Sequence, residues 1–183
     1  MFLYRNNRMK NTIKVVLLGL LISTPVFSTD YFEVAGDIGQ YALPAAGLGV
    51  ALVKKDWKGC LQLTCAFAAT LGVTYALKYT IRETRPNGGT QSFPSGHTSS
   101  AFCGAAFLDL RYGHSFGIPA YAAASLVGWS RIESNNHYPL DVLAGAAIGI
   151  VSNVIFTRSK IKNLKVVPVA GNGTYGAVVL YQW

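Results

Sequence analysis

The sequence predicts an all-α protein: a bundle of five helices, or six with the N-terminal segment, followed by a short C-terminal β-hairpin. Half of the 183 residues are apolar and only 13% are charged, whereas about 25% are charged in an average soluble domain. Five uncharged stretches of 16 to 19 residues, rich in Ala and Gly, follow one another along the chain. None of them shows the strict alternation of a strand. These observations favour helices that are embedded in a membrane or packed into a tightly buried bundle.

Residues 1–28 are predicted to be a signal peptide or an N-terminal anchor. The apolar run Val15–Ile22 is followed by Val26 and Ser28, which suit a small-residue cleavage site. The run is much shorter than the ~20 residues of a membrane span, so cleavage is the preferred interpretation. Either interpretation directs the rest of the chain across a membrane. The basic residues that precede the run are Arg5, Arg8, Lys10 and Lys14.

Residues 30–163 are predicted to form the helical domain. It opens with a polar juncture, residues 30–37, and the five apolar stretches follow. Each stretch is slightly shorter than the ~20 residues of a span, and their small residues suit close helix packing in a membrane or in a soluble bundle. The stretches are Ile38–Val53, Gly59–Leu77, Ser92–Leu108, Ser115–Ser130 and Val142–Thr157.

Residues 164–183 change character and are predicted to form the β-hairpin. Valines gather on both sides of Asn172-Gly173, a dipeptide typical of a tight hairpin turn. One hairpin cannot close a barrel. We therefore expect a C-terminal appendage to the helical domain.

Three cations and one loop point to phosphate binding. Lys78, Arg85 and Arg131 can neutralise a dianion, and the planar Arg fork matches phosphate oxygens. Ser95 and Gly96 precede a predicted helix, where free backbone N–H groups bind anions. Arg82 lies four residues after Lys78 and is a candidate for a secondary phosphate or headgroup contact.

Two histidines complete the candidate site. His97 follows Pro94-Ser95-Gly96, and His137 lies four residues before Asp141. Histidine supplies a nucleophile or a proton donor near neutral pH, and a carboxylate such as Asp141 can orient the ring. We expect the remaining histidine, His114, to be a solvated surface residue.

These blocks together resemble the type-2 phosphatidic acid phosphatase and vanadium haloperoxidase superfamily. The resemblance covers roughly residues 36–158 and includes every signature position. It implies that His137 forms a phosphohistidine, that Asp141 holds His137, and that His97 protonates the leaving oxygen and later activates water. It also implies that the phosphoryl oxygens are held by the residues Lys78, Arg85, Ser95, Gly96 and Arg131. The phosphatase branch needs no metal and no other cofactor.

The connections between the stretches alternate in kind. Residues 54–58, 111–114 and 158–165 are basic but carry no signature residue, whereas every signature residue lies within or directly after residues 78–94 or within residues 131–141. Antiparallel helices place alternate connections at opposite ends. By the positive-inside rule, the site then faces away from the cytoplasm. This predicts a bacterial inner-membrane protein with a periplasm-facing site, with a periplasmic protein as the alternative.

The predicted function is hydrolysis of a phosphate monoester or diphosphate, with a phosphorylated lipid as the expected substrate and the membrane as its setting. The alternatives are a soluble periplasmic acid phosphatase of the same family, a vanadium haloperoxidase, and a non-catalytic envelope protein. Despite a formal net charge of +8, the chain has no basic stripe with interleaved aromatic residues, so nucleic acid is not an expected partner. The sequence leaves the choice of lipid and the oligomeric state unknown.

Overall fold

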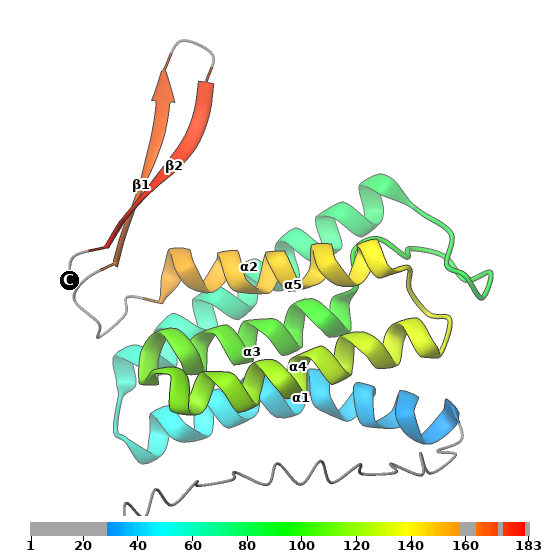
Figure 1. Cartoon of the computed structure of the whole chain (residues 1–183), viewed down its shortest axis with the longest axis horizontal. Helices are drawn as coiled ribbons and strands as arrows, with labels where there is room; N and C mark the ends of the chain where they lie inside the picture. Colours follow the sequence, from blue (N-terminus) through cyan, green and yellow to red (C-terminus); the bar gives the residue numbers. More distant parts are fainter. Residues whose placement is uncertain (1–28, 158–163, 172–173, 182–183) are drawn as a thin grey trace, which may run out of the picture.

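The computed structural model describes residues 29–157, 164–171 and 174–181. Within these ranges the chain forms five helices and one antiparallel pair of strands (Figure 1). The predicted signal peptide or anchor, residues 1–28, lies outside the described residues. The helices are α1 (Thr29–Val53), α2 (Trp57–Ile81), α3 (Gly96–Tyr112), α4 (His114–Glu133) and α5 (Pro139–Phe156).

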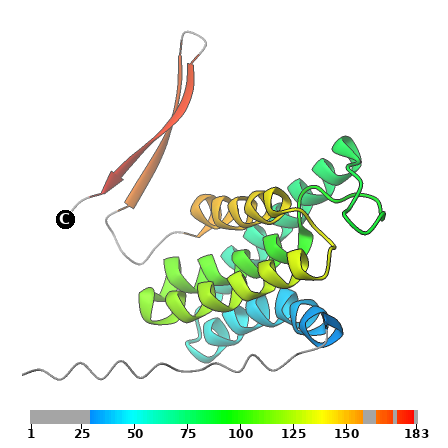
Figure 2. The same cartoon turned by 45° about the vertical axis from the view of Figure 1, so that its right-hand side comes forward.

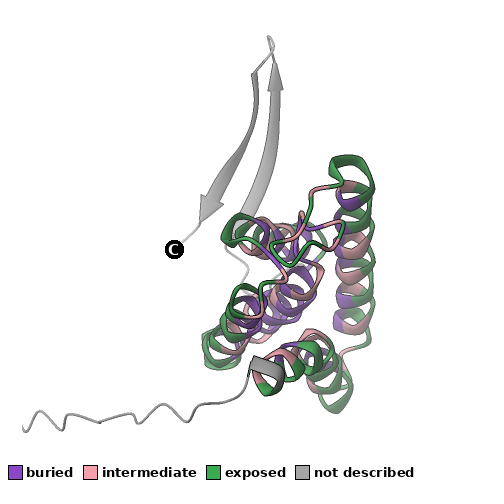
Figure 3. Ribbon diagram, turned by 90° about the vertical axis from the view of Figure 1, so that its right-hand side faces the viewer, coloured by how far each residue is buried: buried purple, intermediate pink, exposed green. Residues whose placement is uncertain are grey.

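Helix α3 forms the centre of the bundle. It packs against each of the other four helices, and the buried residues gather around it in the end-on view of Figure 3. Its interior side chains are mostly small, as at Ala101 and Ala105, and Phe107 is the largest buried apolar side chain there. Small side chains let helix backbones approach closely. The prediction of an all-α bundle is therefore confirmed.

Two glycine contacts show how close the backbones lie. A Cβ atom added to Gly104 of α3 would lie 2.4 Å from the carbonyl carbon of Leu43 in α1. A Cβ atom added to Gly149 of α5 would lie 2.4 Å from the carbonyl oxygen of Ser99 in α3. Any larger residue at these positions would push α1 or α5 away from α3.

The connections divide between the two ends of the bundle. In Figure 1, α1 begins at the end where the α2–α3 and α4–α5 connections lie, whereas the α1–α2 and α3–α4 turns lie at the other. At the first end, Asn87 N–H donates to the carbonyl oxygen of Asn135 at 3.1 Å, joining the two connections. At the other, Arg111 forms an ion pair of 2.6 Å with Asp56. The predicted separation of the two kinds of connection is thus present in the backbone.

The helix limits differ from the predicted ones in ways that matter for the site. The polar residues 30–37 belong to the first turns of α1 rather than to a juncture. Lys78 lies in the last turn of α2 and Arg131 in the last turn of α4, although both were expected in connections. Helices tolerate charges at their ends when these find partners, so the uncharged stretches underestimate helix length.

The outer surface of the bundle is rich in large apolar side chains. Trp57, Leu61, Leu126, Trp129 and Leu143 are each more than half exposed. Among the described helices, α2 and α5 are long and apolar enough to cross a membrane by length and composition. Figure 2 shows α2 running obliquely to the other helices, so part of its surface stands clear of the bundle.

The C-terminal strands β1 (Leu164–Gly171) and β2 (Thr174–Tyr181) pair antiparallel, with Val166 opposite Val179. Within the described part of the chain this ribbon has no third strand. A two-stranded ribbon by itself is only marginally stable in water. The C-terminal hairpin as a stable unit therefore stays a prediction. The helical bundle alone establishes the fold class.

Candidate active site

The candidate residues come together at the end of the bundle where α1 begins. Helix α3 starts at Gly96 with Ser95 as its N-cap, and α5 starts at Pro139, which places Asp141 in its first turn as predicted. The N–H of Ser95 donates to the carbonyl oxygen of Asp141 at 3.0 Å. This bond ties the starts of α3 and α5 together, so the two predicted histidine blocks become neighbours.

His137 lies in a buried polar cluster with Asp141 and Ser92. Its Nδ1 is 3.4 Å from Oδ2 of Asp141 and 3.5 Å from Oγ of Ser92. The Ser92 hydroxyl donates to the same Asp141 oxygen at 2.5 Å, and the backbone N–H of Tyr138 donates to it at 2.9 Å. A carboxylate fixed by two further donors can hold the ring in one orientation.

The pKa of His137 is lowered to about 4, because burial and then the positive charges of Lys78 and Arg85 disfavour the imidazolium. The Asp141 carboxylate acts in the opposite direction. The ring is therefore neutral at pH 7. A neutral ring with Nδ1 toward Asp141 leaves the lone pair of Nε2 free.

Lys78 and Arg85 hold the loop that carries Ser92. The Lys78 ammonium donates to the carbonyl oxygens of Gln91 at 2.7 Å and Ser92 at 3.3 Å. Arg85 Nε donates to the carbonyl oxygen of Thr90 at 3.1 Å. An ammonium has three donors and a guanidinium five. Both cations therefore keep donors for an anion while they order the loop.

His97 and Arg131 share one carboxylate, that of Asp37 in α1. Nε2 of His97 lies 3.0 Å from Oδ1 of Asp37, and Nη1 of Arg131 lies 2.7 Å from the same oxygen. Arg131 also donates from Nε to Oγ of Ser130 at 3.0 Å and from Nη2 to the carbonyl oxygen of Glu33 at 2.5 Å. Three anchors fix this guanidinium, which is almost fully buried.

The other predicted phosphate contacts lie as follows. Ser95 is buried, and its Oγ accepts from the N–H of Thr98 at 3.4 Å, so its hydroxyl caps α3. Gly96 faces Lys78, whose Cε would lie 3.8 Å from a Cβ at that position. Arg82 ends α2 in a left-handed conformation, and its Nε donates back to the carbonyl oxygen of Tyr79. Within the described residues, Arg82 is not drawn into the polar cluster of the other candidates.

The site residues that sequence reasoning missed include Ser92 and Asp37. Ser92 carries no local signal, because only folding brings it to residues 137–141. Asp37 carries a weak one, because Asp30, Glu33 and Asp37 recur at spacings of three and four, which places them on one face of a helix. His114 is exposed as expected, and it lies 2.7 Å from Asp109. Among the described residues, no group of three or more His, Cys, Asp or Glu side chains is arranged to hold a metal ion.

Comparison with known proteins gives consistent matches. The model of the PAP2 superfamily matches residues 87–165. A lipid A 4'-phosphatase of Helicobacter pylori (strain J99) is 30% identical over 93% of this chain and 98% of its own length. A lipid A 1-phosphatase of Porphyromonas gingivalis is 38% identical over 60% of this chain. The matched part of this chain spans only 26% of that relative's length.

Two solved structures share the fold. LpxE of Aquifex aeolicus is similar with a TM-score of 0.64 and 25% identity, covering 73% of this chain and 87% of that one. A transmembrane PAP2 type phosphatidylglycerolphosphate phosphatase of Bacillus subtilis is similar with a TM-score of 0.59 and 25% identity, covering 74% and 77%. Because the signature residues, the bundle and an end-to-end relative all agree, this chain belongs to the PAP2 superfamily.

Proposed function

We propose that this protein is a metal-independent lipid phosphatase, which hydrolyses a phosphate monoester or diphosphate through a phosphohistidine intermediate. One observation carries the proposal. Two histidines, each within reach of a carboxylate, lie at the same end of the bundle as three cations. That set supplies a nucleophile, a proton donor and an anion cradle, which are the parts that phosphoryl transfer requires.

In the first step His137 is the nucleophile. Its Nδ1–H faces Asp141, so the Nε2 lone pair attacks phosphorus while the bond from phosphorus to the leaving oxygen breaks. The electron pair of that bond stays on the leaving oxygen, which takes a proton from His97. The products are the released alcohol, or phosphate ester, and a phosphohistidine.

In the second step water replaces the alcohol. His97, now neutral, takes a proton from the water as its oxygen attacks phosphorus, and the bond between phosphorus and His137 breaks. Inorganic phosphate leaves and both rings return to their starting protonation. During both steps Lys78, Arg85 and Arg131 stabilise the charge on the phosphoryl oxygens.

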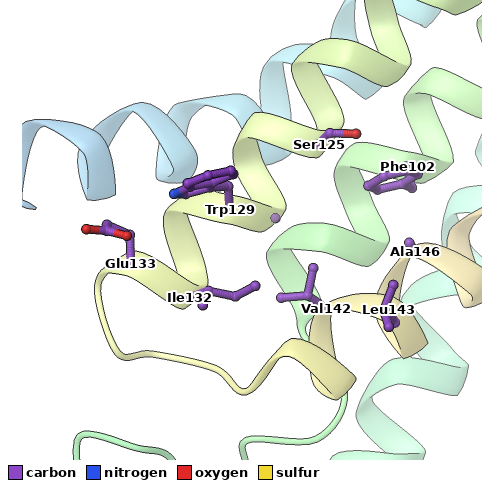
Figure 4. Close-up of a pocket in the computed structure, with 9 residues that line it drawn as sticks. Phe102, Ser125, Trp129, Ile132, Glu133, Val142, Leu143 and Ala146 are labelled. Carbon is purple, nitrogen blue, oxygen red and sulfur yellow. The ribbon is translucent and has the colours of Figure 1, made fainter. Parts of the chain in front are cut away.

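An apolar groove beside the site favours a lipid over a small soluble ester. The groove encloses about 440 Å³ and opens between α3, α4 and α5 (Figure 4). Ile132 and Val142 line it, and each is the chain neighbour of a site residue, Arg131 or Asp141. Its remaining lining residues are Phe102, Ser125, Gly128, Trp129, Glu133, Leu143 and Ala146. An acyl chain in this groove would keep its phosphate near the cations.

We further propose that the protein lies in the bacterial inner membrane with its site facing the periplasm. The exposed apolar side chains and the two span-length helices α2 and α5 support a membrane setting. The basic connections at the opposite end support the orientation. In this arrangement residues 1–28 are a signal peptide or anchor, residues 30–163 are the phosphatase domain, and residues 164–183 are an appendage.

The names of the two curated relatives point to the phosphates of lipid A as the first substrates to test. The experiment is a phosphate-release screen of the purified protein with lipid A, phosphatidic acid, phosphatidylglycerol phosphate, undecaprenyl diphosphate and soluble esters. We expect release from a lipid that persists in a chelator and that orthovanadate inhibits competitively, since vanadate mimics the five-coordinate state. Loss of activity on chelation, restored by a divalent ion, would refute the metal-independent mechanism.

A further inference from the structure

We propose that Asp37 is a positioning residue of this site, which orients His97 for proton transfer. The inference rests on the proposed function and extends it to a residue outside the signature blocks. Asp37 lies in α1, 60 residues before His97 in the chain, and approaches its Nε2 to 3.0 Å. The site then contains two matched pairs, His137 with Asp141 and His97 with Asp37.

The contact determines which nitrogen of His97 transfers the proton. When the ring is an imidazolium, Nε2–H donates to Asp37 and Nδ1–H remains for the leaving oxygen. After that transfer the remaining proton stays on Nε2, which donates it in a hydrogen bond to Asp37. The unprotonated Nδ1 can then accept a proton from water. One ring atom thus serves both steps, and Asp37 prevents the tautomer in which Nδ1 keeps the proton.

Asp37 contributes little to binding the phosphoryl group, because Arg131 does not depend on it. The Arg131 guanidinium keeps two further anchors, Oγ of Ser130 and the carbonyl oxygen of Glu33. An Asn at position 37 would preserve the size of the side chain and an oxygen acceptor. The cradle is therefore expected to survive Asp37→Asn, whereas the uncharged amide oxygen is too weak an acceptor to keep the proton on Nε2 of His97.

Loss of the charge without loss of the cradle can be tested with two substrates that differ in their need for a proton donor. A residue with a purely structural role would affect both substrates equally. Phenyl phosphate and 4-nitrophenyl phosphate have nearly the same shape, but phenolate needs a proton to leave and nitrophenolate does not. For Asp37→Asn we expect kcat to fall at least about tenfold with phenyl phosphate and less than about threefold with 4-nitrophenyl phosphate, since general acid catalysis contributes about 10²–10⁴-fold. The retained activity with 4-nitrophenyl phosphate also shows that the variant is folded.

Two controls accompany the variant. Asp109→Asn makes the same change in the His114–Asp109 pair at the C-terminal end of α3, about 18 Å along the helix from His97, and should leave both rates within twofold of the parent. Asp37→Asn combined with His97→Ala should be no slower than His97→Ala alone, because the two residues act as one unit.

Four results would overturn the proposal. They are unchanged rates with both esters, equal losses with both esters, additive losses in the double variant, and tighter vanadate binding by Asp37→Asn. The last would mean that Asp37 occupies the subsite of a phosphoryl oxygen. A parent protein that releases no phosphate from any ester or lipid would overturn the proposed function, and this inference with it.

Discussion

At the scale of single residues, the two histidines of the site differ in their surroundings. His137 is buried among Ser92, Asp141 and nearby cations, whereas the side chain of His97 is 30% exposed and that of its partner Asp37 is 49% exposed. The proposed role of His137 as nucleophile needs a neutral, fixed ring, and burial supplies both. The proposed role of His97 as proton donor requires exchange of its proton with water during each cycle, and partial exposure allows this.

His137→Ala is expected to abolish turnover while the protein stays folded. Loss of a nucleophile that acts together with an acid and a cradle costs several powers of ten in kcat. Phosphate release and thermal unfolding are measured in parallel, with His114→Ala as the control because His114 is exposed at the other end of the bundle. A residual rate within tenfold of the parent would exclude His137 as the nucleophile.

The pKa of His137 also predicts the acid side of the pH profile. Because burial, Lys78 and Arg85 lower this pKa to about 4, His137 stays neutral as the pH falls from 7 to about 5. The loss of kcat/KM that is due to His137 should therefore begin below about pH 5 and reach half near pH 4. In Lys78→Met one cause of the lowering is gone, so this acid limb should move to higher pH. A limb that stays in place would show that Lys78 has no electrostatic influence on His137.

At the scale of elements, the contact between α3 and α5 determines the distance between the two histidines. Gly145 and Gly149 of α5 face the backbone of α3 at Ser95 and Ser99. One turn further along, Nδ2 of Asn153 donates to the carbonyl oxygen of Cys103 at 2.8 Å. A stripe of small or hydrogen-bonding residues thus holds the two backbones together over most of their length.

Gly149→Leu is expected to separate α3 from α5. Its Cβ alone would lie 2.4 Å from the carbonyl oxygen of Ser99, and overpacking of this kind costs roughly 1–3 kcal/mol. We expect a lower unfolding temperature in detergent and a fall in kcat of at least about tenfold, because a displacement of about 1 Å in a site can cost 10²-fold. Gly72→Leu is the matched control, since a Cβ at Gly72 in α2 meets no atom within 4 Å. Equal behaviour of the two variants would show that the α3–α5 contact does not position the site.

At the scale of the whole molecule, one end of the bundle carries the candidate site and the other carries a structural ion-pair cluster. The structural end is held by the Asp56 carboxylate, which accepts from Arg111 and from the hydroxyl of Tyr112 at 3.1 Å. These bonds hold the pKa of Asp56 well below its usual range. Asp56 also caps α2 by accepting from the N–H of Gly59, so a single charged cluster closes the end opposite the site.

The proposed orientation is tested by labelling single cysteines in intact cells with an impermeant thiol reagent. The turn residues Lys55, Gly88, Gly113 and Asn135 all have positive φ, so cysteine would be strained there. Exposed positions next to these turns are better suited: Thr90 and Glu133 at the site end, Lys58 and Ser115 at the other. In a protein whose native cysteines are replaced by serine, we expect only the Thr90→Cys and Glu133→Cys variants to react. Equal labelling of all four variants would show that the protein does not span the membrane and would favour a periplasmic phosphatase.

Much of the site could be predicted from the sequence, because its chemistry depends on residue types at short spacings. His137 and Asp141 are four residues apart, and Pro139 between them starts a helix by its fixed φ. Ser95 and Gly96 start another helix for similarly local reasons. Local composition likewise determined the number of helices and the division of the connections between two ends.

The tertiary structure decided which polar side chains meet. Asp37 pairs with residues 60 and 94 positions away, His97 and Arg131, and Ser92 with residues 45 and 49 positions away, His137 and Asp141. No local pattern specifies such pairs, because they depend on how closely α1, α3 and α5 pack. That distance is determined by glycines in backbone contact, whose partners are known only after the chain has folded. The sequence therefore determined which candidate groups the chain offers, and the packing of the helices determined which carboxylate lies beside each histidine.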